Sequence, residues 1–250
     1  MSSFATGLIA FLCLFTGALL GMGLRRALPD HHLSPESRHL LEIGLGIIGT
    51  MAGLVLGLLV ASATTSYNAQ RSEILDASSK VVLLDRILAH YGPEAEPARR
   101  VLRATIERTL ERIWPDEPTR APQLSPSFRS EALFETVEDL VPRNDLQRSL
   151  KPAATDLVVS LGQIRWLIYE QSGSTVSLPL LILLVFWFTI TFVGFGLFAP
   201  RNATTIAALA LCALAVSGAI FITVAMYKPF EGVVRIPSTS LREALVQLGH

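Results

Sequence analysis

Four long stretches without a charged residue constrain this chain more than any other feature of its sequence. Each stretch is at least as long as the roughly 20 apolar residues that a helix needs to cross a bilayer. Few buried core helices are as long and as uncharged. Hydrophobic residues make up 50% of the 250 positions and charged residues only 17%. We therefore predict an all-α membrane protein with four transmembrane helices, whose cores lie at about 4–24, 43–63, 178–199 and 204–226.

The spans divide the chain into two hairpins separated by a long polar insertion. We expect a first transmembrane hairpin at 1–63, a helical cytoplasmic region at 64–175, a second hairpin at 176–227 and a cytoplasmic tail at 228–250. No basic segment precedes the first span, so we expect it to be retained rather than cleaved as a signal peptide.

The basic residues that flank the spans give a weak indication of orientation, because cytoplasmic flanks are enriched in Lys and Arg. Six lie on the side of the polar insertion and four on the other, which favours cytoplasmic termini in a bacterial inner membrane. Arg25 and Arg26, taken with the first span alone, favour the reverse. The six are Arg71, Lys80, Arg165, Lys228, Arg235 and Arg242, and the four are Arg25, Arg26, Arg38 and Arg201.

The second span belongs to an unusually long predicted helix. Ser34 is a candidate N-cap with Pro35 in the first turn, and Gly92 and Pro93 end the helix near Tyr91. At 1.5 Å per residue such a helix is roughly 85 Å long, so it extends far beyond the membrane. Its distal part has apolar residues at three- and four-residue spacing, as expected of a helix-packing seam: Ile74, Ala77, Val81, Leu84, Leu88 and Tyr91.

Four shorter helices are predicted outside the membrane, which makes this region a helical bundle. They span about 94–114, from Ser125-Pro126 to about 140, from about Pro152 onward, and a tail helix introduced by a capping box at Ser240–Glu243. We expect the tail helix to dock on the bundle through Leu241, Leu245 and Leu248. The expected inner faces are Ala98, Val101, Thr105 and Ile113 in the first helix, and Ala154, Leu157, Leu161, Ile164 and Ile168 in the third.

Composition and missing motifs argue against several functional classes. The formal net charge is zero, which gives no pull toward nucleic acid. Cys13 and Cys212 lie inside predicted spans without metal-ligand spacing, so we expect them to pack as small apolar residues. No phosphate-binding loop or hydrolase motif occurs. The span cores have no acid or base, which argues against a pump but is compatible with passive permeation. We therefore expect no enzyme activity, catalytic residue, cofactor or metal.

Small and polar residues form a stripe along one face of the long helix. At 100° per residue they fall within an arc of about 120°, although Ile43, Val60 and Tyr67 share it. Such a stripe is typical of close helix packing, in which glycines let two backbones approach. It is also typical of a pore wall, with charged residues only at the mouths. The stripe consists of His39, Glu42, Gly46, Gly49, Thr50, Gly53, Gly57, Ala61, Thr64, Asn68 and Arg71.

Several segments resemble the bestrophin-like domain proteins of bacteria. They lie at 33–38, 49–63, 84–86, 90–95, 112–115, 195–202 and 229–232, and so run over nearly the whole chain. The most specific positions include Pro200, Arg201, Asn202, Pro229, Phe230, Glu231 and Gly232.

The resemblance implies a distant relation to bestrophins, which are pentameric anion channels with four spans per subunit and cytosolic termini. In those channels the second spans line the pore. Their bulky apolar neck residues are replaced here by Gly, Ala and Thr, and their acidic calcium-binding run is reduced to Glu231. We therefore expect neither a hydrophobic gate of that kind nor a calcium switch, since calcium needs several oxygen ligands together.

These observations favour a homo-oligomeric membrane ion channel, with a pentamer preferred. The long helix would line a path for small inorganic anions such as chloride, with Arg71 raising their concentration at the cytosolic mouth and with Thr50 and Thr64 donating hydrogen bonds to them. The alternative is a non-conducting membrane scaffold or signalling protein, in which the glycines only pack.

Overall fold

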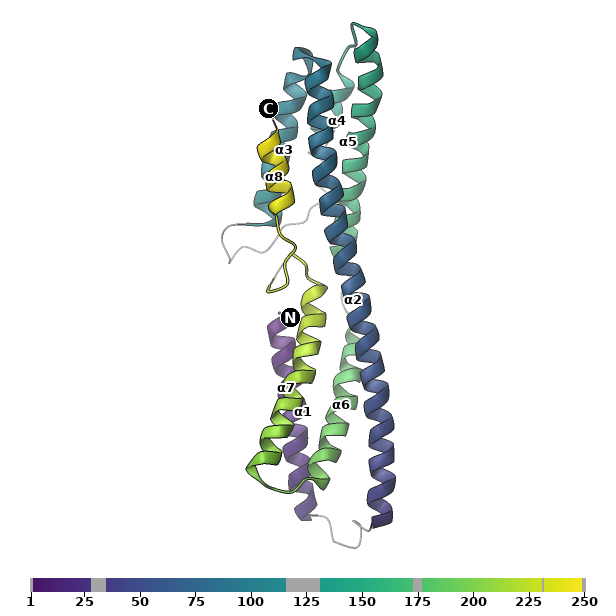
Figure 1. The fold of residues 1–250 in the computed structure, drawn as a ribbon, viewed down its shortest axis with the longest axis vertical. Helices are drawn as coiled ribbons and strands as arrows, with labels where there is room; N and C mark the ends of the chain where they lie inside the picture. Colours follow the sequence, from purple (N-terminus) through teal and green to yellow (C-terminus); the bar gives the residue numbers. More distant parts are fainter. Residues whose placement is uncertain (1, 28–34, 116–130, 173–176, 231, 249–250) are drawn as a thin grey trace. The chain divides into compact units, whose positions relative to one another are not determined.

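The computed structural model describes residues 2–27, 35–115, 131–172, 177–230 and 232–248, and every regular element in these ranges is helical (Figure 1). The all-α prediction is confirmed. The helices are α1 (Ser3–Ala27), α2 (Pro35–Tyr91), α3 (Glu96–Ile113), α4 (Glu131–Glu138), α5 (Asp145–Ser172), α6 (Leu178–Phe198), α7 (Ala203–Met226) and α8 (Thr239–Gln247), with a 3₁₀ turn at Pro93–Ala95.

The chain forms two compact units, both of which include part of α2. The first unit contains Met1–Ser66 and Thr175–Tyr227, and the second contains Tyr67–Ser174 and Lys228–His250. Helices α1, α2, α6 and α7 are each long and apolar enough to cross a membrane. The four predicted spans are therefore confirmed: the predicted cores 4–24 and 43–63 lie within α1 and α2, and the cores 178–199 and 204–226 match α6 and α7 to within one residue at each end.

Within the first unit, α1 packs closely along α6 and α7 (Figure 1). Two glycines permit the approach of α1 to α6. A Cβ atom on Gly196 would overlap the carbonyl oxygen of Ala18, and a Cβ atom on Gly21 would overlap that of Val193. Backbone therefore meets backbone at this crossing, as is common between membrane helices that have small residues at their interface.

The predicted limits of α2 are confirmed at both ends, since the helix runs from Pro35 to Tyr91. Gly92 ends it with a φ of 113°, a conformation that L side chains rarely adopt. The turn that follows is held by Gln147, whose amide Nε2 donates to the carbonyl of Tyr91 at 2.8 Å.

The second unit is built around the distal half of α2. Val81, Leu84 and Leu88 are fully shielded from solvent and belong to a core that also receives side chains from α3, α4, α5 and α8. The predicted seam is thus confirmed. Leu241 and Leu248 of the tail also lie in this core, which confirms that the tail helix docks on the bundle.

A buried ion pair joins α2 to α3 in this unit. Arg99 donates from Nε to Asp85 Oδ1 at 2.8 Å and from Nη2 to Oδ2 at 3.0 Å. The hydrogen bonds to Asp85 raise the pKa of Arg99, with burial acting in the opposite direction. This paired geometry is the strong form of an arginine–carboxylate contact.

Three predicted helix details in the second unit are wrong. Helix α5 begins at Asp145 rather than near Pro152, which lies inside it, because the side chain of Asn144 accepts from the backbone N–H of Gln147 at 2.8 Å and caps the start. Helix α8 begins at Thr239, so Ser240 is inside the helix and forms no capping box. The inner face of α3 also differs, since Ala98 and Ile113 are buried as predicted but the residues between them are not those predicted. These are Leu102, Ile106 and Leu110, whereas Val101 and Thr105 are only half-buried.

Of the helix expected from Ser125-Pro126 to about 140, the structure describes α4, and the positions before 131 lie outside the described residues.

Candidate pore-lining helix

Within the first unit, one face of α2 packs against the other spans. Leu45 projects onto Gly194 of α6, where a Cβ atom would clash with its side chain. Ala52 and Ala63 follow on the same side of the helix and are fully buried. This face packs α2 into the first unit, and its position determines where the other faces of α2 point.

The small-residue stripe lies to one side of this packed face. An added Cβ atom would meet no atom within 4 Å at Gly46, Gly53 or Gly57. At Gly49, on the border with the packed face, it would lie 3.6 Å from Cγ2 of Thr191. Contact with α1, α6 and α7 of the same chain therefore does not explain why Gly53 and Gly57 are small.

The two threonines of the stripe use their hydroxyl protons within α2. Thr50 Oγ1 donates to the carbonyl of Gly46 at 2.8 Å, and Thr64 Oγ1 donates to that of Val60 at 2.8 Å. Such bonds to the preceding turn are common for Ser and Thr in helices. An anion would receive a hydrogen bond from either threonine only after the hydroxyl had rotated away from its carbonyl.

Most of the other stripe residues are exposed in the isolated chain. His39, Glu42 and Ala61 are exposed within the first unit. Asn68 and Arg71 are exposed within the second unit. The stripe thus belongs to both units, and its segment from His39 to Ala61 lies on one side of α2, mostly exposed. Thr64 is half-buried, with its Oγ1 3.8 Å from Sδ of Met226 in α7.

Large apolar side chains form a further face of α2, next to the stripe. They are exposed in the isolated chain, as expected of a surface that meets lipid or another protein. These residues are Ile43, Ile47, Met51, Leu54 and Leu58. Cys13 and Cys212 are exposed on α1 and α7, so the expectation that they pack as small apolar residues is not met within one chain.

The segment at 195–202 has a structural role in the first unit. Arg201 donates from Nη2 to the carbonyl of Met22, and Arg25 donates from Nη1 to that of Ala199 at 3.2 Å. These contacts tie the end of α1 to the α6–α7 turn, in which Pro200 lies. Asn202 caps α7, accepting from the backbone N–H of Thr205 at 2.8 Å.

The segment at 229–232 has a corresponding role in the second unit. Phe230 is buried and meets the Trp114 ring edge-on, with ring centroids 5.8 Å apart. The carbonyl of Pro229 accepts from the N–H of Ile236 at 2.8 Å, and Gly232 turns the chain with a φ of 77°. Glu231 lies outside the described residues.

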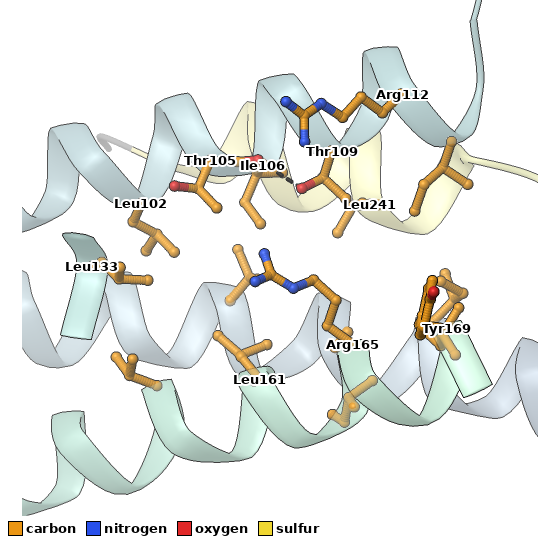
Figure 2. A pocket seen from close by; sticks show the side chains of 18 residues that line it. Leu102, Thr105, Ile106, Thr109, Arg112, Leu133, Leu161, Arg165, Tyr169 and Leu241 are labelled. Atoms are coloured by element: carbon orange, nitrogen blue, oxygen red, sulfur yellow. Dashed lines mark hydrogen bonds between the residues drawn. The ribbon is translucent and has the colours of Figure 1, made fainter. Parts of the chain in front are cut away.

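A cavity in the second unit was not anticipated from the sequence (Figure 2). Its volume is about 140 Å³, and its lining includes Arg112 and Arg165. The sequence position of Arg165 could have indicated this cavity. Arg165 follows Leu161 by four residues and precedes Ile168 by three, which places a cation on the inner side of α5. Within the described part of the chain, no group of three His, Cys, Asp or Glu side chains is close enough to hold a metal ion.

Four apolar helices of this length define a multi-pass membrane protein. The bestrophin-like domain family matches residues 12–241, and the chain therefore belongs to that family. The resemblance inferred from the sequence is confirmed. No curated protein and no solved structure matches the chain.

Proposed function

We propose that this protein is a homo-oligomeric ion channel, most simply a pentamer, that passes small inorganic anions such as chloride along α2. The proposed setting is a bacterial inner membrane, with 64–175, the tail at 228–250 and both termini in the cytoplasm. No catalytic residue, cofactor or metal takes part in this proposal, and nucleic acid is not a partner.

The observation that carries the proposal is the open side of α2. Only 11% of its most apolar window is buried, compared with 39% in α1, 33% in α6 and 22% in α7. The least covered span therefore contains the glycine stripe, and Gly53 and Gly57 face away from the rest of the chain. In an oligomer this side is free to face a central path or a neighbouring copy.

Charge at the Arg71 end of the stripe supports anion passage, whereas Glu42 lies at the other end. Arg71 is exposed, and a ring of such arginines around a mouth would raise the local concentration of anions. The stripe between Gly46 and Thr64 contains no ionisable side chain, so it would neither trap nor repel an ion strongly. This pattern fits conduction better than coupled transport.

The test is anion flux through the purified protein in liposomes, with two matched variants on α2. Gly53→Leu places a branched side chain on the stripe, whereas Gly44→Leu places the same side chain about 180° away around the helix. Neither glycine has an atom of its own chain within 4 Å of an added Cβ atom. We expect the wild type and Gly44→Leu to conduct and Gly53→Leu to assemble normally with much lower flux.

Other outcomes would identify the rival function. Absence of flux for chloride, nitrate and small cations in the wild type would favour a scaffold or signalling protein. A Gly53→Leu protein that no longer assembles would show that the stripe packs against a neighbouring copy. Equal flux in all three proteins would remove α2 from the conduction path.

A further inference from the structure

The second unit contains a partly open cavity with two kinds of lining. It lies among α2, α3 and α5, with Leu133 of α4 and Leu241 of α8 also bordering it. Figure 2 shows Arg112 from α3 and Arg165 from α5 reaching toward the same part of the cavity, with Thr109 between them in this view. Aliphatic side chains provide most of the remaining wall.

The apolar part has the dimensions of a site for a compact organic group. Leu102, Ile106 and Leu161 contribute to this wall, and the cavity volume is about 140 Å³. An apolar protein cavity of roughly 150 Å³ is large enough to bind benzene. The space is therefore suited to a single aromatic ring or a short aliphatic chain.

The polar part is cationic. Burial lowers the pKa of Arg165, and the nearby positive charge of Arg112 lowers it further. A guanidinium nevertheless stays protonated at neutral pH, so both charges persist. Thr109 donates its hydroxyl proton to the carbonyl of Thr105 at 2.7 Å. Each guanidinium carries five N–H donors, so it can bind a ligand as well as a protein group. Arginine is well suited to binding a carboxylate through two parallel hydrogen bonds.

We propose that this cavity binds a small organic monocarboxylate of about the size of benzoate. Its apolar body would lie against Leu102, Ile106 and Leu161, and its carboxylate would accept hydrogen bonds from Arg112 and Arg165. This site is separate from the stripe on α2, and its existence does not depend on whether the protein conducts ions.

The test is a fluorine NMR titration of the full-length protein in detergent with para-fluorobenzoate, compared with the neutral para-fluorobenzamide. We expect saturable binding of the benzoate and at least about tenfold weaker binding of the amide. Arg112→Gln and Arg165→Gln should each weaken benzoate binding by at least about tenfold. Arg100→Gln is the control on α3, because Arg100 is exposed and does not line the cavity.

A second variant tests the apolar part without altering charge. Ala77 of α2 lines the cavity and is half-buried, so Ala77→Leu should fill part of the space and abolish benzoate binding while circular dichroism shows unchanged helicity. Equal binding of benzoate and benzamide would overturn the proposal. So would full benzoate binding in folded Arg165→Gln or Ala77→Leu protein, or an equally large loss in Arg100→Gln.

Discussion

Replacing Asp85 by Asn should destabilise the second unit through its buried ion pair with Arg99. The exposed fractions of the two side chains are 6% for Asp85 and 19% for Arg99. Asparagine keeps one acceptor oxygen but turns an NH₂ group toward the guanidinium, so one of the two charge-assisted hydrogen bonds is lost, at a cost of about 1.5–3 kcal/mol. Breaking a fully buried pair costs about 3–5 kcal/mol. Glu96, 3.7 Å from Arg99, and some remaining water reduce this cost, so we expect about 2–3 kcal/mol.

Thermal melting of the full-length protein in detergent, followed by circular dichroism, measures the effect. For a unit of this size the expected loss lowers the Tm by roughly 10 °C. Glu107→Gln is the control, because its pair with Arg103 is exposed, at 46% and 52%, and should contribute less than about 0.5 kcal/mol. Adding Arg99→Leu to Asp85→Asn should recover part of the loss by removing the largely buried charge that no longer faces a carboxylate at residue 85. Equal Tm shifts for Asp85→Asn and Glu107→Gln would refute the reasoning.

Three further substitutions test other contacts. Gly196→Ala should separate α1 from α6 and prevent recovery of folded protein by size-exclusion chromatography, whereas Gly218→Ala, which has no atom within 4 Å of the added Cβ, should behave as wild type. Because the φ of Gly92 is positive, Gly92→Ala should lower the free energy of unfolding by about 1–2 kcal/mol and lower the Tm. An unchanged Tm would show that alanine is not strained at this position. Trp114 Nε1 donates to the carbonyl of Ile236 at 2.8 Å, so Trp114→Phe should cost about 1–3 kcal/mol and speed proteolysis after residue 230, and unchanged cleavage would count against that contact.

The parts of the fold that depend on local chemistry could be predicted from the sequence. The limits of α2 follow from Pro35 at one end and from Gly92 and Pro93 at the other, because these residues restrict the backbone wherever they occur. The predicted start of α5 was wrong because Pro152 is tolerated inside the helix, and Asn144, eight residues earlier, supplies the cap. Proline marks a break or a first turn only on average.

Features that depend on contacts between distant residues could not be predicted. Arg201 and Asn202 were noticed through the family resemblance, but their roles at the end of α1 and the start of α7 emerge only when the helices are assembled. The cavity joins Arg112 and Arg165 from two helices, and no local spacing relates them. The stripe was predicted as a face, yet the side of α2 that is covered depends on Leu45 and its packing partner in α6.

The inward hydrogen bonds of Thr50 and Thr64 have a consequence for ion hydration in the proposed pore. Both hydroxyl groups donate to carbonyls of α2, and that of Thr64 also lies 3.8 Å from Met226 Sδ, so the stripe between Gly46 and Ala61 presents C–H groups and oxygen lone pairs to an ion. Such a wall offers nothing that replaces the water bound to an anion, unlike a filter whose polar groups substitute for the hydration shell. An anion would therefore cross this stretch with its water, and halides with different dehydration energies would pass at similar rates, while anions too wide in their hydrated form would be held back.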